Sequence, residues 1–511
     1  MSDTQVLIAG AGPTGLVLAI WLQRLGVPVR IVDQAVAPGT TSRALVVHAR
    51  TLEFYRQVGL AEAVVERALE MTSVNLWAKG KKAARVFFGP LGQGMSPFPY
   101  VLILPQDEHE RLLIEHLAEY GVQVERRTQL IGFEDSGGRV LARLRRPDGT
   151  EETCEAAYLA GCDGARSTVR DVLGAGFPGG TYSHLFYVAD VEASGPVMDR
   201  EIHVALDDVD FLVVFPMKGA GRARLIGTVR QEGEGEQEEL SWDDVTRDVI
   251  GRLGITVKRV NWFSTYRVHH RVADHFRRGR AFLLGDAAHI HSPVGGQGMN
   301  TGIGDAVNLA WKLAAVLHGG ADTTLLDTYE PERIAFARRL VATTDRAFTV
   351  VTSAGPVARR VRVDIAPRLL PVLFTSRAFR RLMFRTVSQI AINYRGSSLS
   401  EGRAGNVRGG DRLPWVTAGR TSDKGSDNFS PLTSLDWQVH VYGGAAAPIA
   451  EVCARRGLAL QTFPWQSAAS RAGLARGAVY LLRPDGYVGL ADPEASPARV
   501  ESYLDARRLR P

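Results

Sequence analysis

Three glycines near the start of the chain and one acidic residue about twenty positions later have the spacing of a dinucleotide-binding turn. Gly10, Gly12 and Gly15 form G-x-G-x-x-G, and Asp33 closes the next apolar segment. In such a turn the first glycine permits a tight bend, the second lets the backbone approach a pyrophosphate, and the third lets helix and strand pack closely. The carboxylate would accept hydrogen bonds from a ribose. This motif predicts binding of an ADP moiety and leaves open whether FAD or NAD carries it.

Two later segments bear on that choice. Residues 158–170 read YLAGCDGARSTVR and contain Asp163, and residues 280–310 read RAFLLGDAAHIHSPVGGQGMNTGIGDAVNLA and contain Asp286. Asp286 follows an apolar segment at 281–284, so we expect its carboxylate at the carboxyl end of a strand, where α/β sheets bind ligands. The following loop, Pro293–Asn300, leads into a helix, and its backbone N–H groups could stabilise negative charge on a bound ligand.

Together the three segments resemble the fingerprints of the para-hydroxybenzoate hydroxylase family of flavoprotein aromatic monooxygenases. The resemblance runs along about the first 345 residues and includes SRALVVHARTLE at 42–53 and LPQDEHERLL at 104–113. It implies FAD as the cofactor, NADPH or NADH as the electron donor, and a small aromatic substrate that is hydroxylated with O2 through a flavin hydroperoxide. It also implies which residues contact the cofactor: Gly10, Gly12, Gly15, Asp33, Arg43, Gln106, Asp163, Asp286, Pro293, Gly298, Met299 and Asn300.

No acid–base residue can be assigned from the sequence. Arg43 and His269 are candidates for a catalytic role, in a reaction that the family centres on the flavin. Phe211, Val213 and Phe215 alternate with Leu212 and Val214, so one of the two sets could line a substrate pocket while the other packs a core. No spacing of histidine and cysteine residues indicates a metal site.

The pattern of apolar residues predicts an α/β fold: a Rossmann-like FAD-binding domain, an antiparallel-sheet substrate domain and a C-terminal thioredoxin-like domain. We expect the first part of the FAD-binding domain at 1–180, with about 70–105 contributing to the substrate domain, and the substrate domain itself at 181–265. The FAD-binding domain returns at 266–345, a helical segment follows at 346–400, and a linker with the thioredoxin-like domain fills 401–511.

The thioredoxin-like expectation rests on VYLLRPDGYVGL at 479–490, which resembles the closing strands of that domain in phenol and pentachlorophenol hydroxylase relatives and in polyketide-tailoring hydroxylases. The domain has no C-x-x-C, and Cys453 alone could not carry out thioredoxin chemistry, so we expect a structural role. Gly489 stands where many relatives have a larger residue.

Composition narrows the function classes. A net charge of +6 over 511 residues is too dilute for a nucleic-acid-binding surface. With three cysteines and neither an export signal nor a membrane span, the sequence predicts a cytoplasmic protein without membrane insertion. The oligomeric state stays open, with a homodimer as one alternative.

An arginine-rich stretch could meet a membrane, a partner or an acidic ligand, or could simply pack as an amphipathic helical pair on its own protein. Its members are Arg359, Arg360, Arg362, Arg368, Arg377, Arg380, Arg381 and Arg385.

Competing functions share parts of this pattern. A pyridine-nucleotide dehydrogenase would explain Gly10 to Asp33 but not Gly285-Asp286, and a flavin-dependent halogenase would carry a W-x-W-x-I-P signature that this sequence lacks. Baeyer–Villiger oxidation or epoxidation of a polyketide by the same flavin chemistry, and a non-catalytic flavoprotein that binds an aromatic ligand, remain alternatives.

Overall fold

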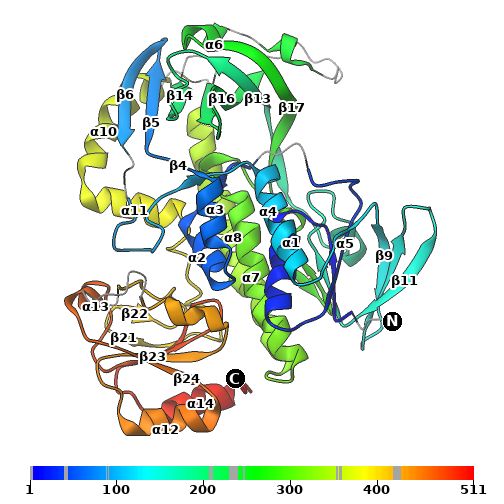
Figure 1. The fold of residues 1–511 in the computed structure, drawn as a ribbon, viewed down its shortest axis with the longest axis vertical. Coiled ribbons are helices and arrows are strands. Elements are labelled where there is room, and N and C mark those ends of the chain that lie inside the picture. Colours follow the sequence, from blue (N-terminus) through cyan, green and yellow to red (C-terminus); the bar gives the residue numbers. More distant parts are fainter. Residues whose placement is uncertain are drawn as a thin grey trace.

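The computed structural model describes residues 4–39, 44–87, 89, 91–206, 211–229, 240–245, 248–352, 355, 359–417 and 427–511. Figure 1 shows an elongated molecule with an antiparallel sheet at one end, the C-terminal sheet at the other, and a helix-covered parallel sheet between them. In the described part of the chain, no helix is both long and apolar enough to span a bilayer.

The parallel sheet is built from short strands, of which the central ones are buried on both faces. Its order is β18-β19-β12-β1-β2-β8, with β1 (Val6–Ala9), β2 (Val29–Asp33), β8 (Glu125–Arg126), β12 (Tyr158–Gly161) and β19 (Ala281–Leu283) parallel and β18 (Arg277–Arg278) antiparallel at the edge. The continuous apolar sequence of β1 and the complete burial of β1, β12 and β19 are typical of such central strands. The chain therefore returns to this sheet after a long excursion.

Helices on the parallel sheet place the glycine-rich turns. Helix α1 (Pro13–Arg24) begins with a proline, which suits the first helical position because it needs no N–H partner. It packs against α7 (Gly298–Leu317) and α4 (Gln106–Glu119). Four further helices lie nearby: α2 (Ala49–Gln57), α3 (Ala61–Arg67), α5 (Thr168–Leu173) and α8 (Tyr329–Thr352). One small sheet consists of β3 (Val46–Val47), β7 (Leu102–Ile103) and β4 (Leu69–Glu70). The other consists of β11 (Glu151–Ala156), β10 (Val140–Arg145) and β9 (Gln129–Asp135).

The second sheet has the order β20-β17-β13-β16-β15-β14-β5-β6 and is antiparallel except for the parallel pair β14–β5. Its members are β5 (Ser73–Ala78), β6 (Lys81–Phe87), β13 (Gly179–Ser194), β14 (Ile202–Leu206), β15 (Phe211–Pro216), β16 (Arg222–Val229), β17 (Thr256–Val272) and β20 (His289–Ile290). Strand β17 continues past residue 265, the boundary expected from sequence, because it stays paired with β13 and then with β20. Helix α6 (Asp248–Arg252) contributes to the core on one face of this sheet.

The C-terminal sheet has the order β22-β21-β26-β25-β23-β24. It contains β21 (Glu401–Ala404), β22 (Val407–Arg408), β23 (Gln438–Tyr442), β24 (Ala459–Phe463), β25 (Val479–Leu482) and β26 (Val488–Asp492), with helices α12 (Ala447–Arg456), α13 (Ser467–Arg471) and α14 (Pro497–Ala506). Residues 401–408, expected to begin a linker, form strands because β21 pairs in parallel with β26. Helix α10 (Ala366–Thr375) packs beside β6 of the antiparallel sheet, and α11 (Arg377–Val387) follows it on the side toward the C-terminal sheet (Figure 1).

Candidate cofactor site

The first two sequence motifs meet in a cavity of about 290 Å³ at the carboxyl ends of β1, β2 and β12. Gly10 has φ +102°, and a Cβ atom there would lie 2.2 Å from the carbonyl oxygen of Cys162, so only glycine fits between the two turns. A Cβ at Gly12, in contrast, would meet no atom within 4 Å. The second glycine therefore faces open space that a pyrophosphate can approach. The cavity is lined by Ala9, Gly10, Gly12, Val32, Asp33, Gln34, Ala35, Thr128, Gln129, Leu130, Cys162, Asp163, Gly164, Arg166 and Thr168.

Asp33 lines this cavity with its carboxylate held by backbone groups. It accepts hydrogen bonds of 2.7 Å from the N–H of Ala11 and from the N–H of Ala35, and Arg126 lies 3.5 Å away. Each carboxylate oxygen has two lone pairs, so acceptor capacity remains for a ribose hydroxyl. The cavity and this carboxylate fit the adenosine half of FAD.

Asp163 holds the start of α5. Its carboxylate accepts from the Ser167 hydroxyl at 2.5 Å and from the Val169 N–H at 3.0 Å, and burial raises the pKa of Asp163. Arg170, on the same helix, donates to the carbonyl of Ala287 at 3.1 Å. The segment 158–170 is thereby joined to the segment 280–310.

Asp286 is exposed in the short turn Gly285–Ala287, and Gly285 adopts φ +57° against α1. The turn is fixed by Asp305, a buried residue of α7 that sequence reasoning missed. Asp305 accepts from the N–H of Gly285 at 3.0 Å, and its side chain lies 2.7 Å from His289 Nε2 and 2.5 Å from Arg333 Nε. Burial alone would raise the pKa of Asp305, but Arg333 and His289 outweigh it and lower that pKa. A lone carboxylate in the apolar run of α7 was the available signal.

The loop Pro293–Asn300 turns through two left-handed glycines, Gly295 (φ +78°) and Gly296 (φ +62°). Pro293 and Gly295 are exposed, and Gly298 and Met299 are half-buried where α7 begins. Backbone at this turn is accessible to a flat ring, as a flavin would require.

Asn300 stabilises this loop from inside. Its amide nitrogen donates to the carbonyls of Val46 (2.8 Å) and Gly296 (2.9 Å), and its oxygen accepts from the His48 N–H (3.0 Å) and the Thr51 hydroxyl (2.7 Å). Four hydrogen bonds use the full capacity of the side chain. Only the backbone of Asn300 is therefore available to a cofactor.

His48 supports the same loop. Its Nε2 lies 2.9 Å from the carbonyl of Gly295, so this nitrogen carries the proton and donates. Burial lowers the pKa of His48 to about 4, and the ring is neutral at pH 7.

Three other candidates lie on other elements or outside the described residues. Gln106 begins α4 and donates to Glu110 at 2.8 Å. His269 lies on β17, where its Nδ1 is 2.7 Å from the Thr181 hydroxyl. Arg43 lies outside the described residues.

The alternation on β15 is resolved by packing. Leu212 and Val214 are buried in the core beneath α6, whereas Phe211, Val213 and Phe215 pack with Leu45 and Ile103 on the opposite face. That face is turned toward the first part of the chain, which also carries the cofactor motifs.

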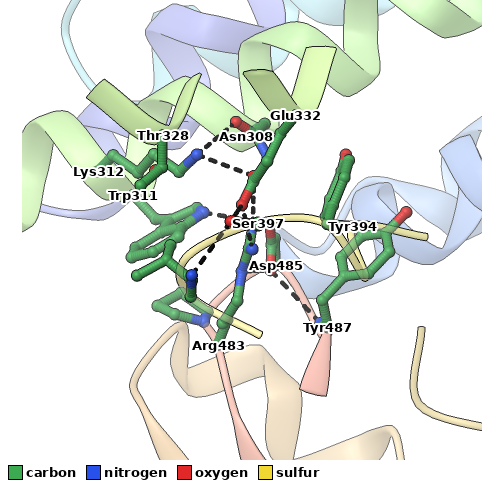
Figure 2. Close-up of polar contacts among 12 residues, drawn as sticks. Asn308, Trp311, Lys312, Thr328, Glu332, Tyr394, Ser397, Arg483, Asp485 and Tyr487 are labelled. Carbon is green, nitrogen blue, oxygen red and sulfur yellow. Dashed lines mark hydrogen bonds and ion pairs between the residues drawn. The ribbon is translucent and has the colours of Figure 1, made fainter. Parts of the chain in front are cut away.

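Behind the cofactor site, a buried ionic cluster joins α7 and α8 to the C-terminal sheet (Figure 2). Arg483 donates to Glu332 at 2.8 and 3.0 Å and to Asp485 at 3.0 and 2.6 Å, and Lys312 donates to Glu332 at 2.9 Å. These four side chains are at most 1% exposed. Two positive and two negative charges balance each other, and burial lowers the pKa of Lys312 to about 8.

Within the described ranges, no group of three or more histidine, cysteine or acidic side chains could hold a metal ion.

Comparisons with known proteins agree with this geometry. Residues 3–344 match the family model described as FAD binding domain. The chain is 34% identical to 6-methylpretetramide 4-monooxygenase of Streptomyces rimosus over 99% of its own length and 94% of that protein. It is 32% identical to pentachlorophenol 4-monooxygenase of Sphingobium chlorophenolicum over 81% of its length and 76% of that protein. The solved structure of an anhydrotetracycline hydroxylase from Streptomyces rimosus superposes with a TM-score of 0.79 at 28% identity, covering 100% of this chain and 99% of that one.

Proposed function

Because this chain belongs to the FAD-binding family of flavoprotein aromatic monooxygenases, we propose that it uses NADPH or NADH and O2 to hydroxylate a phenolic or polycyclic aromatic substrate. The observation that carries the proposal is the meeting of three separate motifs in one region. Gly10 lies against Cys162, Arg170 reaches Ala287, and a Cβ at Gly285 would lie 2.7 Å from the hydroxyl of Thr14 on α1. No single nucleotide-binding turn would require all three.

The bound FAD supplies the redox and oxygen-activating chemistry, and the protein supplies binding, orientation and electrostatics. We assign the adenosine half to Gly10, Gly12, Gly15, Asp33 and Asp163. Asp286 and the backbone of Pro293, Gly298, Met299 and Asn300 contact the ribityl and ring end, and Arg43 and Gln106 complete the contacts.

The substrate is proposed to lie against the face of β15 that carries Phe211, Val213 and Phe215. This wall is apolar, with Leu45 and Ile103 packed beside it. Apolar walls exclude water and bind flat aromatic rings. Relatives named for pretetramide and anhydrotetracycline support a polycyclic substrate.

The first experiment tests the cofactor. Asp286→Ala removes an exposed carboxylate, so the protein should stay folded and soluble while bound flavin is lost. The matched control is Asp436→Ala, which removes an exposed carboxylate from the C-terminal part. Flavin absorbance after purification and an FAD titration give the result. Full flavin occupancy in Asp286→Ala would contradict the assignment.

The second experiment tests the reaction. Phenols, hydroxylated polyketides and aryl acids are each incubated with NADPH, NADH and 18O2, and nucleotide oxidation is compared with the labelled product. A hydroxylated ring supports the proposal. A lactone or ester from ring expansion would indicate Baeyer–Villiger oxidation, an epoxide would indicate epoxidation, and ligand binding without nucleotide oxidation would indicate a non-catalytic flavoprotein.

We also propose that the C-terminal part is a thioredoxin-like domain with a structural role. A parallel β23–α12–β24 unit is followed by the antiparallel pair β25–β26 and by α14. Cys453 is buried, and burial raises the pKa of its thiol to about 11. A protonated, enclosed thiol is a poor nucleophile.

A further inference from the structure

A second, larger cleft of about 890 Å³ lies where three parts of the chain meet. Its walls come from the loop around Gln93, from α11, from Trp415 to Thr417, and from α13 (Figure 1 shows α11 facing the C-terminal sheet). None of the sequence motifs assigned to the flavin contributes to it.

The lining of this cleft is strongly cationic. Arg377, Arg380, Arg381 and Arg471 line it, and none of its described lining residues is acidic. Among the described residues, no ion pair joins Arg377, Arg380 or Arg381 to a carboxylate, and the Nε of Arg380 is buried without a hydrogen-bond partner. Four like charges around one opening repel each other unless an anion lies between them.

Helical spacing places these arginines on one face. Arg377, Arg380 and Arg381 are related by three and four residues, and the buried Phe384 continues the same row. Phe384 packs directly on Gly92, where a Cβ would lie 2.2 Å from its ring. This contact fixes the arginine face of α11 toward the cleft.

Trp415 adds an aromatic surface with a fixed orientation. Its indole N–H donates to Asp427 at 3.0 Å, and Asp427 is in turn paired with Arg56 at 2.7 Å. The ring is half-buried at the edge of the cleft. Arginines together with an aromatic ring are the combination that binds phosphates and stacks a nucleotide base.

Helix α11 also connects the cleft to the loop Pro293–Asn300. At its end, the carbonyl of Val387 accepts from the Gln297 amide at 3.3 Å, and Gln389 donates to the Gln297 side chain at 2.9 Å. Arg380 lies seven residues before Val387, or about 10 Å along the helix. The arginine row and the contacts to this loop therefore lie on the same helix, so a ligand held at the arginines is coupled to the loop through α11.

We propose that this arginine cleft binds the adenosine phosphates of NADPH, with the adenine on Trp415 and the 2′-phosphate and pyrophosphate among Arg377, Arg380 and Arg381. The proposal rests on the proposed function, which requires a nicotinamide donor. It also accounts for the lack of a second G-x-G-x-x-G in the sequence.

The test uses the FAD-loaded full-length enzyme and the variants Arg380→Gln and Arg377→Gln/Arg381→Gln. We expect each to raise the KM for NADPH at least about tenfold, since a charge-assisted hydrogen bond to phosphate is lost, with kcat at saturation and flavin content unchanged. Arg385→Gln is the matched control, because it removes the same charge from an exposed position of α11 outside the cleft. It should leave the KM unchanged.

Direct binding separates this proposal from the proposed function. Titration calorimetry with 2′,5′-ADP, ADP and inorganic pyrophosphate should show binding to the wild-type protein that Arg380→Gln weakens and Arg385→Gln does not. If the wild type oxidises NADPH but neither variant changes its KM, or if Arg385→Gln has the same effect, the cleft assignment is overturned while the monooxygenase stands. If 2′,5′-ADP binds at the arginines and no donor is oxidised, the cleft stands and the proposed function fails.

Discussion

Asp305 shows how much of the cofactor site depends on a single residue that does not face the cofactor. It joins the N–H of Gly285 to His289 and to Arg333, which also donates to the Tyr394 hydroxyl at 2.9 Å. Asp286 is exposed to solvent because Asp305 holds the neighbouring Gly285 from the buried side of the turn. Loop geometry is thereby set by a buried charge pair.

Asp305→Ala is expected to lose FAD and stability together. Arg333 would remain buried without its charge partner, which costs about 3–5 kcal/mol. FAD affinity should fall at least about tenfold because the turn at Gly285 loses its anchor. Flavin titration and denaturant unfolding measure both effects. Asp305→Asn, which keeps an acceptor for Gly285, should lie between, and wild-type affinity in Asp305→Ala would contradict the role.

Buried neutral histidines make the protein sensitive to acid. Burial lowers the pKa of His440 on β23 to about 3, below its unfolded value near 6.5, so the unfolded chain binds a proton that the folded chain does not. This contribution is complete above the unfolded pKa and is lost as the pH falls below it. From about pH 7 to about pH 5, one such histidine should cost about 2 kcal/mol.

The corresponding measurement compares urea unfolding of the wild type and of His440→Gln at both pH values. Glutamine has no titration in this range, so the loss of stability on acidification should be smaller by about 2 kcal/mol in the variant. Equal losses in the two proteins would show that His440 is protonated alike in both states.

At the scale of elements, packing explains a glycine that the sequence left unexplained. A Cβ at Gly489 on β26 would lie 2.5 Å from the Tyr503 hydroxyl and 3.2 Å from the ring of Trp437. Tyr503 on α14 is buried and donates to the carbonyl of Leu399 at 2.7 Å. The tyrosine fills the space that a larger residue on the strand would need.

Gly489→Ala should therefore destabilise the protein by about 1–3 kcal/mol through overpacking. Adding Tyr503→Phe removes the hydroxyl that the new methyl group meets, so the double variant should recover part of the loss relative to the sum of the single variants. Thermal unfolding of the four proteins measures the coupling. Strict additivity would mean that the two residues do not compete for space.

For the whole molecule, the cluster around Arg483 and Glu332 connects the C-terminal sheet to the cofactor site. Glu332 and Arg333 are neighbours on α8: the first is bound by Arg483 of the C-terminal sheet and the second binds Asp305. The turn between β25 and β26 is also held by Gln57, which donates to the carbonyl of Pro484 at 2.8 Å. The C-terminal part is thus packed into the scaffold that positions the flavin.

Arg483→Met should destabilise the protein by about 3–5 kcal/mol, because Glu332 and Asp485 would remain buried with less compensating charge. Arg455→Met is the control, since this exposed arginine pairs with Glu501 at the surface and should change stability by less than about 1 kcal/mol. We also expect weaker FAD binding in Arg483→Met alone. Unchanged stability and unchanged flavin affinity in Arg483→Met would show that the cluster does not couple the C-terminal sheet to the cofactor site.

The local sequence determined the cofactor turns, because the glycine spacing acts within one turn and the acidic residue ends the next strand of the same short β–α–β unit. The family, the FAD cofactor and the monooxygenase reaction were predicted from those motifs together with the family resemblance, and the comparisons with known proteins agree with these predictions. The alternation of side chains on the two faces of β15 was also visible in the sequence. Which of the two faces is turned toward the cofactor motifs depended on the segments that pack against each face.

Only the tertiary structure decided the contacts between residues distant in sequence. Asp305 and Arg483 look like ordinary charges in the sequence, residues 401–408 look like a linker, and the side chain of Asn300 looks available to a cofactor. Their roles depend on partners that come from other segments of the chain. Burial, charge pairing and saturation of hydrogen bonds exist only once those segments have been brought together.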